Sequence, residues 1–522
     1  MLVNYVIKNR FYDSVLLMQI ANDIKSHFGF EKVSVMMGTV PNKDLMTETE
    51  VLCDEGRAAG ANDVIVAFAS DDGADFAGAL EFLNGLLEKR DVKLDTGGVN
   101  VSYPTVDAAF KAHDDANIVF ISLPGPFVRY EAQKAVKLGL NVMIFSDNVS
   151  LEDEIALKRE ALKKNVMVMG PDCGTTIVKG VALGFANVIQ AGDVGIAGAS
   201  GTGIQELTVL LSDKGIGITH ALGTGGRDVT APVGGITILQ AIKALEEDEA
   251  TKIVAVISKP PCDEVVRKML DELEKGGKPA VVCFMRDGEV PKDYANIRFA
   301  ATIEDEVGIL EEMKTGVPYR KSLFSEDFES VARRAREAAS RLAPEQKYIR
   351  GLYSGGTLCD EALIILRHAL GDVWSNTSLY PDRRLENARI AKEHSLVDMG
   401  DDEFTRGMPH PMIDFTLRKE RLAEECRKKD VGVILLDVVL GYGSHMNPAK
   451  ELAEVIVRER AAANAEGRDF VVCAYICGSE GDPQNRDKQK RLLEEAGVIL
   501  MPSNAQAARF SALAITRGEA SL

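Results

Sequence analysis

The sequence predicts a multidomain α/β protein that ends in two similar modules in tandem. The first observation is the stretch 193–207, where small and β-branched residues lead into a glycine turn and apolar residues then recur at helical spacing. The second is a copy of this strand, turn and helix at 347–361. The two turns consist of Ser200, Gly201, Thr202 and Gly203, and of Ser354, Gly355, Gly356 and Thr357.

The position of these turns at helix N-termini indicates phosphate binding. Unpaired N–H groups and the positive end of the helix dipole favour an anion there, and glycine lets a phosphate come close to the backbone. An ordinary strand-to-helix turn of a doubly wound sheet also uses Gly and Ser, so this alternative stays open. The second copy favours the phosphate interpretation.

The repeat continues beyond the turns. A glycine- and acid-rich loop follows each copy, at 223–228 and at 399–402, and prolines come next at Pro232 and at Pro409 and Pro411. Each loop is followed by an apolar run, 252–257 and 431–436, of the kind found in buried parallel strands. The chain therefore looks like a divergent tandem of two α/β modules.

Composition excludes several classes of function. The net charge of −18 over 522 residues argues against nucleic-acid binding, because no basic stripe is present to neutralise phosphates. The eight cysteines are scattered without the spacing of a metal site, so we expect reduced thiols and no metal. No apolar run approaches a membrane span, and the N-terminus lacks the regions of a signal peptide. We therefore expect a cytoplasmic protein without a membrane partner.

Five segments are predicted in chain order. Residues 1–95 form a small α/β domain with strands at 2–7, 32–36 and 64–68 and helices at 12–27 and 75–89. This domain has no motif for chemistry, and we expect a packing, regulatory or partner-binding role. The others are a Rossmann-like domain at 96–190, module one at 191–315, a solvated linker helix at 316–345 and module two at 346–522.

The predicted Rossmann-like domain alternates strands and helices but lacks the common nucleotide motifs. A strand from 116 breaks into a loop at 124–127, and a capping box of Ser150 and Asp153 starts a helix. A further strand enters the loop 170–174. Neither the glycine fingerprint of dinucleotide-binding folds nor a P-loop is present, so nicotinamide and P-loop nucleotides are not supported.

One loop of module two is a second candidate for anion contact. Residues 441–445 contain Gly441, Gly443, Ser444 and His445 just before a predicted helix with Asn447 as N-cap and Pro448 as its first residue. A histidine there suits an anion contact or proton transfer. A hydrogen-bonded surface histidine is the alternative.

From about residue 115 to 522 the chain resembles the NDP-forming acyl-CoA synthetases, such as succinyl-CoA synthetase, and within them the FdrA protein family. The turn at 200–203 with Glu206 resembles the family's phosphate-binding helix start, and module two resembles the C-terminal domain of the synthetase β subunit. Motifs of the family's CoA-binding domain resemble the loops that contain Pro124, Gly125, Pro126 and Phe127, and Gly170, Pro171, Asp172 and Cys173.

The resemblance implies a Rossmann-like CoA-binding-type domain followed by two flavodoxin-like modules. In this family two helices converge on one phosphate. The resemblance implies that 200–203 and 441–445 are the two halves of one phosphate site, with Glu206 as a catalytic carboxylate. The turn at 354–357 is a second candidate for binding phosphate. CoA or a nucleotide stays open as a cofactor.

Two departures from the family pattern bear on the mechanism. Family ligases relay phosphate through a histidine, yet this chain has no histidine between His220 and His368. They also need an ATP-grasp domain of about 200 residues, and the 95-residue N-terminal segment is too short for one. We therefore expect that this chain alone does not make acyl-CoA.

A phosphate site without a kinase half can still hold an acyl phosphate while a nucleophile attacks its carbonyl. The resemblance to FdrA implies a subunit of an oxamate carbamoyltransferase of allantoin and purine breakdown, acting with other subunits. In this hypothesis His445 donates a hydrogen bond or a proton, and Arg227 pairs with a substrate carboxylate. For Arg227, the alternative is a loop arginine that pairs with Asp228 or solvent. For the whole chain, the alternative functions are an acyl-CoA ligase and a regulatory scaffold.

Overall fold

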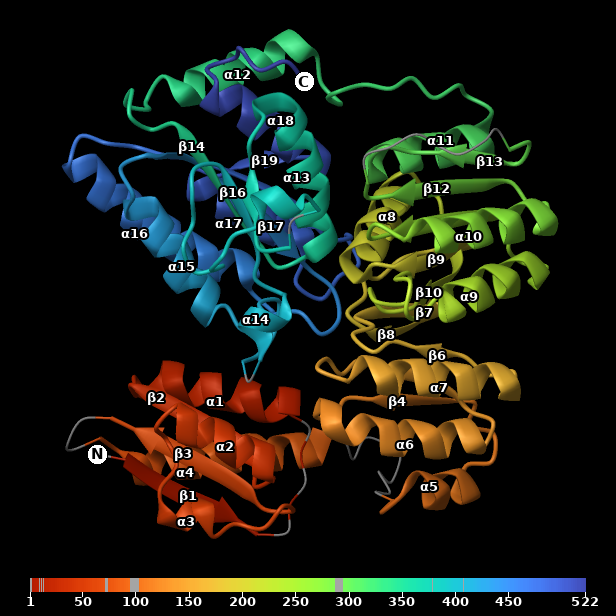
Figure 1. The fold of residues 1–522 in the computed structure, drawn as a ribbon. Coiled ribbons are helices and arrows are strands. Elements are labelled where there is room, and N and C mark those ends of the chain that lie inside the picture. Colours follow the sequence, from red (N-terminus) through yellow and green to blue (C-terminus); the bar gives the residue numbers. More distant parts are fainter. Residues whose placement is uncertain are drawn as a thin grey trace. The chain divides into compact units, whose positions relative to one another are not determined.

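A computed structural model describes residues 2–8, 10, 12, 14–70, 74–93, 103–286, 294–377, 379–406 and 408–522 (Figure 1). The chain divides into two compact units. The N-terminal unit comprises residues 1–116 with 406–409, and the main unit comprises 117–405 with 410–522.

The N-terminal unit contains a three-stranded antiparallel sheet. Its strands β1 (Leu2–Ile7), β2 (Lys32–Met37) and β3 (Val64–Ala69) take the order β1-β3-β2, which confirms the three predicted strands. The two long helices α1 (Ser14–Phe28) and α4 (Phe76–Lys93) are also as predicted. Three shorter helices, which were not predicted, are α2 (Val40–Glu48), α3 (Asp54–Arg57) and α5 (Val106–Ala112).

The main unit begins with a small parallel sheet of order β4-β5-β6. Its strands β4 (Ile118–Ile121), β5 (Asn141–Ile144) and β6 (Val168–Met169) alternate with α6 (Gly125–Lys137) and α7 (Leu151–Lys164). The predicted capping box is confirmed at its first half, because the side chain of Ser150 accepts from the N–H of Asp153 at 3.1 Å. The predicted loop at 124–127 is wrong: Pro124 is the N-cap, and Gly125 starts α6.

Module one is built on a seven-stranded sheet. Five parallel strands, β9 to β13, are extended by the antiparallel hairpin β7–β8, in the order β13-β12-β11-β9-β10-β7-β8. Because the hairpin precedes residue 190, this sheet crosses the predicted boundary there. The strands are β7 (Thr175–Val178), β8 (Val181–Gly184), β9 (Ala191–Ala199), β10 (Ile218–Gly223), β11 (Ile253–Ser258), β12 (Ala280–Phe284) and β13 (Ile297–Phe299). The helices are α8 (Gly201–Asp213), α9 (Ile236–Glu247), α10 (Asp263–Gly276) and α11 (Ile303–Thr315).

Module two has a six-stranded parallel sheet of order β15-β16-β14-β17-β18-β19. The strands are β14 (Tyr348–Tyr353), β15 (Trp374–Ser375), β16 (Ser395–Asp398), β17 (Val431–Val439), β18 (Val471–Cys477) and β19 (Ile499–Met501). The helices are α13 (Gly356–Leu370), η1 (Pro381–Arg383), α14 (Asp402–Thr405), α15 (Thr416–Arg427), α16 (Pro448–Ala465), α17 (Arg486–Glu495) and α18 (Asn504–Ile515).

The two modules have the same strand order. In module one, the five strands β9 to β13 are numbered 1 to 5 along the chain and lie in the flavodoxin-like order 2-1-3-4-5. In module two, numbering β14, β16, β17, β18 and β19 as 1 to 5 gives the same order. The predicted tandem is therefore confirmed. In such sheets ligands bind beyond the carboxyl ends of the strands, where the strand order reverses. Here those points lie after β9 and β11 and after β14 and β17.

The linker helix differs from the prediction of a solvated segment. Helix α12 (Phe328–Ala339) buries the side chains of Val331, Ala332, Ala335 and Ala339, and it packs against α18. Its charged residues made the segment look solvated, but its apolar residues recur at helical spacing and form a buried stripe.

No helix in the described part of the chain combines the length and the apolar character that a membrane crossing requires.

A fully buried ion network joins α7 to module one. The ammonium group of Lys158 lies 2.9 Å from Glu154 Oε1 and 2.7 Å from Asp228 Oδ1, and it donates to the carbonyl oxygen of Thr224 at 3.1 Å. Asp228 also accepts from the N–H groups of Thr237 and Ile238 in the first turn of α9. Lys158 therefore pairs with buried Asp228 and shares Glu154 with Arg227, whose Nε lies 3.0 Å from Glu154 Oε2.

We expect Lys158→Met to destabilise the main unit by about 3–5 kcal/mol, because it removes the cation that pairs with buried Asp228 and leaves buried Glu154 with Arg227 alone. Urea unfolding followed by circular dichroism measures this loss. Lys163→Met, at an exposed position of the same helix, is the matched control and should change stability by less than about 0.5 kcal/mol. A small effect of Lys158→Met would contradict the role given to this network.

Candidate functional site

The N-termini of α8 and α13 meet, which brings together the two turns that repeat in the sequence. Ser200 is the N-cap of α8 and its Oγ accepts from the N–H of Gly203 at 2.9 Å. The same Oγ lies 2.5 Å from Thr357 Oγ1 in the first turn of α13. A Cβ atom placed on Gly355 would lie within 2.9 Å of Thr202, so only glycine permits this approach.

Four backbone N–H groups at this meeting point can donate to an anion. The N–H groups of Gly201, Thr202, Gly356 and Thr357 have no acceptor within the described residues. Gly201 and Gly356 are half-buried and therefore lie closest to solvent. Two helix dipoles point their positive ends at the same place. Together with the two hydroxyl groups, these donors form an arrangement suited to a phosphate.

The beginning of the second turn already holds a carboxylate of the protein itself. Asp437 on β17 is fully buried and accepts from the N–H groups of Ser354 at 2.9 Å and of Gly355 at 2.8 Å. Arg418 on α15, also fully buried, donates to Asp437 Oδ1 at 2.6 Å. Ser354 and Gly355 are thus engaged internally, which leaves Gly356 and Thr357 as the free half of this turn.

Lys259 supplies a positive charge beside the N-terminus of α13. It follows β11 directly, and its Nζ would lie 3.0 Å from a Cβ atom placed on Gly356. Within the described ranges no carboxylate lies at ion-pair distance from this nitrogen. Desolvation lowers the pKa of Lys259, but Asp360, Asp398 and Asp172 outweigh it and raise that pKa above its usual value. Lys259 is therefore a protonated cation rather than a nucleophile.

Two buried carboxyl groups near Lys259 titrate close to neutral pH. Desolvation raises the pKa of Asp360 on α13 to about 7 and that of Asp398, at the end of β16, to about 6. Among the described residues, Asp360 Oδ1 has no hydrogen-bond partner. The same holds for the buried Oγ1 of Thr175, which would lie 3.5 Å from a Cβ atom on Gly201. Unpartnered buried polar atoms at both helix ends indicate a place for an external polar group.

His410 is a further donor at this site. Its Nδ1 accepts from the N–H of Met412 at 3.2 Å, which places the proton of the neutral ring on Nε2. Desolvation lowers the pKa of His410 to about 4, so the ring is neutral at pH 7. Its Nε2 would lie 2.8 Å from a Cβ atom on Gly400, two residues after Asp398.

The loop 441–445 packs beside α8 rather than at the meeting of the two helix ends. Gly441 has a φ of +106°, and the N–H of Tyr442 donates to the carbonyl oxygen of Ala186 at 2.7 Å. Gly443 lies against Phe185, and the buried Ser444 Oγ has no partner in the part of the chain that the structure describes. The N–H of His445 donates to the carbonyl oxygen of Met412, and its Nδ1 accepts from the N–H of Asn447 at 3.1 Å. The structure thus joins 200–203 to 355–357, and a role of 441–445 in anion binding stays a prediction.

Arg227 pairs with a carboxylate of the protein. Its Nε lies 3.0 Å from Glu154 Oε2, and its Nη2 donates to the carbonyl oxygen of Val149 at 2.8 Å. Asp228, its neighbour in sequence, bonds Lys158 and α9 instead. The position of Arg227 therefore fixes a loop, and its pairing with a substrate carboxylate stays a prediction.

Glu206 caps a helix of the other module. Its Oε1 accepts from the N–H of Asn504, the first residue of α18, at 3.2 Å. Glu361 on α13 accepts from the N–H of Ile303, the first residue of α11, at 2.9 Å and from Asn504 Nδ2 at 2.8 Å. Desolvation and the charge of Glu361 raise the pKa of Glu206 well above its usual value.

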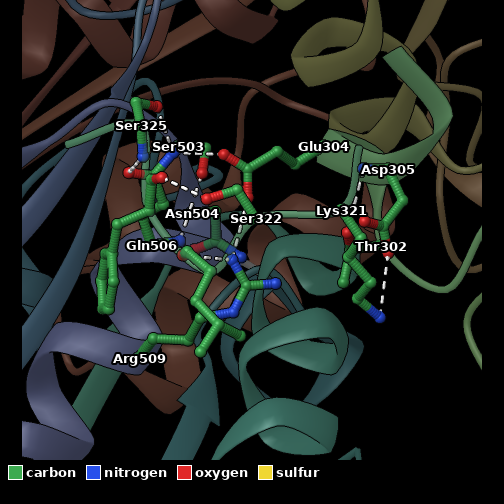
Figure 2. A network of polar contacts seen from close by, with 12 residues as sticks. Thr302, Glu304, Asp305, Lys321, Ser322, Ser325, Ser503, Asn504, Gln506 and Arg509 are labelled. Carbon is green, nitrogen blue, oxygen red and sulfur yellow. Dashed lines mark hydrogen bonds and ion pairs between the residues drawn. The ribbon is translucent and has the colours of Figure 1, made fainter. Parts of the chain in front are cut away.

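A polar network at the same module junction surrounds these caps (Figure 2). Gln506 on α18 bonds Glu304 on α11 and Ser325 of the linker, and Arg509 donates to Glu304 Oε2 at 2.9 Å. Thr302 and Ser503, the N-caps of α11 and α18, lie in this network. This network ties α18 of module two to α11 of module one.

The two loops predicted to belong to a CoA-binding domain lie in the first part of the main unit. Gly125, Pro126 and Phe127 form the first turn of α6 after the N-cap Pro124. Gly170 and Asp172 have positive φ angles on either side of Pro171, and the side chain of Asp172 is exposed. Cys173 is buried, and desolvation raises the pKa of its thiol to about 11. A role of these residues in CoA binding stays a prediction.

Sequence analysis missed Lys259, Asp360, Asp398 and His410. Lys259 and Asp398 stand at or directly after the carboxyl ends of buried strands, and this position was a usable signal. Asp360 and His410 carried no such signal, because a helix residue and a loop histidine become site residues only when the two modules pack. Across the described residues, no group of three His, Cys, Asp or Glu side chains could hold a metal ion.

Comparison with known proteins gives three family matches. The CoA-ligase family matches residues 352–514, the CoA binding domain matches 189–286, and the AllF heavy metal-associated domain matches 1–101. The CoA-binding match thus lies on module one and includes the turn at 200–203.

The relatives include one protein that matches over the full length. This chain is 41% identical to "Uncharacterized protein YahF" of Escherichia coli K12 over 521 residues, which cover 99% of this chain and 100% of YahF. It is 30% identical to the alpha subunit of succinate–CoA ligase [ADP-forming] of Staphylococcus epidermidis over 161 residues, which cover 30% of this chain and 51% of that subunit. The apo acetyl-coenzyme A synthetase 1 of Ca. Korarchaeum cryptofilum matches at 15% identity and a TM-score of 0.31, over 80% of this chain and 86% of that chain.

The fold and the family matches define an acyl-CoA-synthetase-like protein with CoA-binding, CoA-ligase and small N-terminal domains. Within this class the chain belongs to the FdrA-type family, together with YahF.

We expect the affinity of the site for sulfate to fall about tenfold or more as the pH rises from about 5.5 to 8. Asp398 and Asp360 lose their protons in this range and then repel the anion, whereas Lys259 stays charged and His410 stays neutral. Sulfate is a dianion throughout, so the change reports the protein. Calorimetric titration measures it, and Asp398→Asn should flatten the profile. An affinity that is constant or rises with pH would contradict this assignment.

Proposed function

We propose that the chain binds phosphate or an acyl phosphate at the meeting N-termini of α8 and α13 and serves as a subunit of an oxamate carbamoyltransferase. The observation that carries this proposal is the contact of 2.5 Å between Ser200 Oγ and Thr357 Oγ1, each at the start of a long helix. A phosphate would replace that contact by two hydrogen bonds, one from each hydroxyl, and would accept from the first N–H groups of both helices.

The transfer needs stabilisation of phosphate rather than a phosphorylated residue. A phosphate oxygen attacks the carbamoyl carbon of oxalurate, an O–C bond forms, and the C–N bond to the oxamate nitrogen breaks. The phosphate proton passes to that nitrogen, giving oxamate and carbamoyl phosphate. Helix N-termini and Lys259 would hold the phosphate charge in both directions. This agrees with the absence of a histidine between His220 and His368.

An acyl-CoA ligase is the competing function. The match of a CoA binding domain to residues 189–286 favours it, because this range includes the N-terminus of α8. CoA carries phosphate groups that could take the same N–H donors. A regulatory scaffold that binds neither ligand is the third candidate. The same proposal includes a cytoplasmic location and a dependence on partner subunits. The eight free cysteines are compatible with this location.

We expect Ser200→Asp to abolish binding of phosphate and carbamoyl phosphate, while Ser200→Asn retains it within about tenfold. Asp and Asn are both good N-caps of similar size, so this pair differs mainly in a negative charge at the helix end. Calorimetric titrations with phosphate, carbamoyl phosphate and CoA measure the effect on the purified chain.

Each outcome of these titrations decides between the candidates. Binding of phosphate or carbamoyl phosphate that is lost only in Ser200→Asp supports the proposed site, and transferase assays with partner subunits follow. Binding of CoA alone favours the ligase. If the wild type binds none of the three ligands, the transferase proposal fails and the scaffold is favoured.

A further inference from the structure

Two buried glutamates meet at the junction of the modules without a cation. Glu206 on α8 and Glu361 on α13 are both shielded from solvent. Asn504 lies between them, because its backbone N–H donates to Glu206 Oε1 at 3.2 Å and its Nδ2 donates to Glu361 Oε2 at 2.8 Å. No lysine, arginine or histidine of the described residues forms an ion pair with either carboxyl group. Arg509 on α18 pairs with Glu304 instead.

The two carboxyl groups differ in the donors that they meet. Glu361 accepts at both oxygens, from the N–H of Ile303 at 2.9 Å and from Asn504 Nδ2. Glu206 accepts at Oε1 only, and its buried Oε2 has no partner in the described part of the chain. Ile303 and Asn504 are equivalent first residues of α11 and α18, but isoleucine has no side-chain donor to offer. One acid is therefore fully hydrogen-bonded to N–H groups, and the other is not.

The side chain of Asn504 cannot turn over to supply the missing donor. Its Nδ2 donates to the carbonyl oxygen of Leu358 at 2.8 Å as well as to Glu361, so exchanging its nitrogen and oxygen would leave both acceptors facing an oxygen. Its Oδ1 is itself buried and lacks a donor among the described residues. A proton on Glu206 Oε2 would supply the donor that these acceptors lack.

Electrostatics favours the same member of the pair. Desolvation raises the pKa of Glu361 to about 7, although the hydrogen bonds from Asn504 and Ile303 oppose this rise. Desolvation and the charge of Glu361 raise the pKa of Glu206 well above its usual value. Glu361 is therefore the first of the two to ionise as the pH rises, and Glu206 keeps its proton.

The other titratable groups around the pair offer no cation in place of that proton. Arg509, whose charge acts on Glu361, is paired with Glu304, and Asp437 is paired with Arg418. The remaining neighbours are thiols and phenols that burial keeps neutral, since it raises their pKa values: Cys283, Tyr353, Tyr475 and Cys477.

We propose that at neutral and mildly alkaline pH the two glutamates hold a single proton, on Glu206 Oε2, and that this proton is required for the two modules to stay packed. Ionisation of Glu206 would place two buried negative charges on either side of Asn504, with no cation between them. The caps of α18 and α11 would then separate. The contact between Ser200 and Thr357, at the start of the same two helices, would be lost with them. This inference concerns the assembly of the main unit and holds whether or not the chain binds phosphate.

Thermal unfolding of the full chain at about pH 6 and about pH 8.5 tests the proposal. Trp374, the single tryptophan, lies in module two, so its fluorescence reports the unfolding of the main unit. The folded wild type holds a proton that the unfolded chain loses above the usual glutamate pKa, so its stability falls as the pH rises. In Glu206→Gln the amide nitrogen donates instead and needs no proton. We expect this variant to raise the unfolding midpoint by at least about 3 °C at the higher pH and by less at the lower pH.

Glu361→Gln is the matched variant at the equivalent position. Its amide nitrogen would face the N–H of Ile303 or the Nδ2 of Asn504, which are both donors. We therefore expect an unfolding midpoint below that of the wild type at both pH values. Glu420→Gln, at an exposed position on α15, is the control and should shift the midpoint by less than about 1 °C.

Infrared spectroscopy at about pH 8 gives a second measurement that does not depend on stability. The C=O band of protonated carboxylic acids should be weaker in Glu206→Gln than in Glu361→Gln. A higher unfolding midpoint in Glu361→Gln than in Glu206→Gln would place the proton on the other glutamate and overturn the assignment. The same pH dependence of the midpoint in the wild type and in Glu206→Gln would show that the pair holds no proton, and the proposal would fail.

Discussion

The structure of the main unit depends on an exchange of helix caps between its two modules. Glu206 and Glu361 occupy equivalent positions, each six residues after the N-cap of α8 or α13. Each carboxylate accepts from the first N–H of the last helix in the other module, α18 or α11. Because both pairs are buried, neither module can shift without breaking a cap, and the start of α8 is held against the start of α13.

This constraint explains how a phosphate site can exist without a phosphorylated histidine. The two hydroxyls, and four N–H groups that have no acceptor among the described residues, come from two helices that are equivalent in the two modules. The network in Figure 2 joins α18 to α11 and to the linker. Asp437 and Arg418 fill the rest of the second turn, which leaves only its first helical residues for a ligand. Lys259 then adds a cation beside the start of α13.

Much of this arrangement could be predicted from the sequence, because it depends on local patterns. The glycine turns, the strands after them and the tandem order all have periodicities that local physics fixes. The partner of Ser200 was harder to assign, since 441–445 and 355–357 have similar composition and only packing places Thr357 beside it. Lys259 of module one comes beside Asp398 and His410 of module two only when the modules pack, although Lys259 and Asp398 each stand at or directly after the end of a strand.

The most direct test of the account is a crystal structure of the chain grown with phosphate or carbamoyl phosphate. We predict an anion at the meeting helix ends, bonded to the hydroxyl groups of Ser200 and Thr357 and to N–H groups of both helices. An anion bound to one helix alone, or bound at 441–445 while the contact between Ser200 and Thr357 persists, would contradict the central claim that two modules build one site.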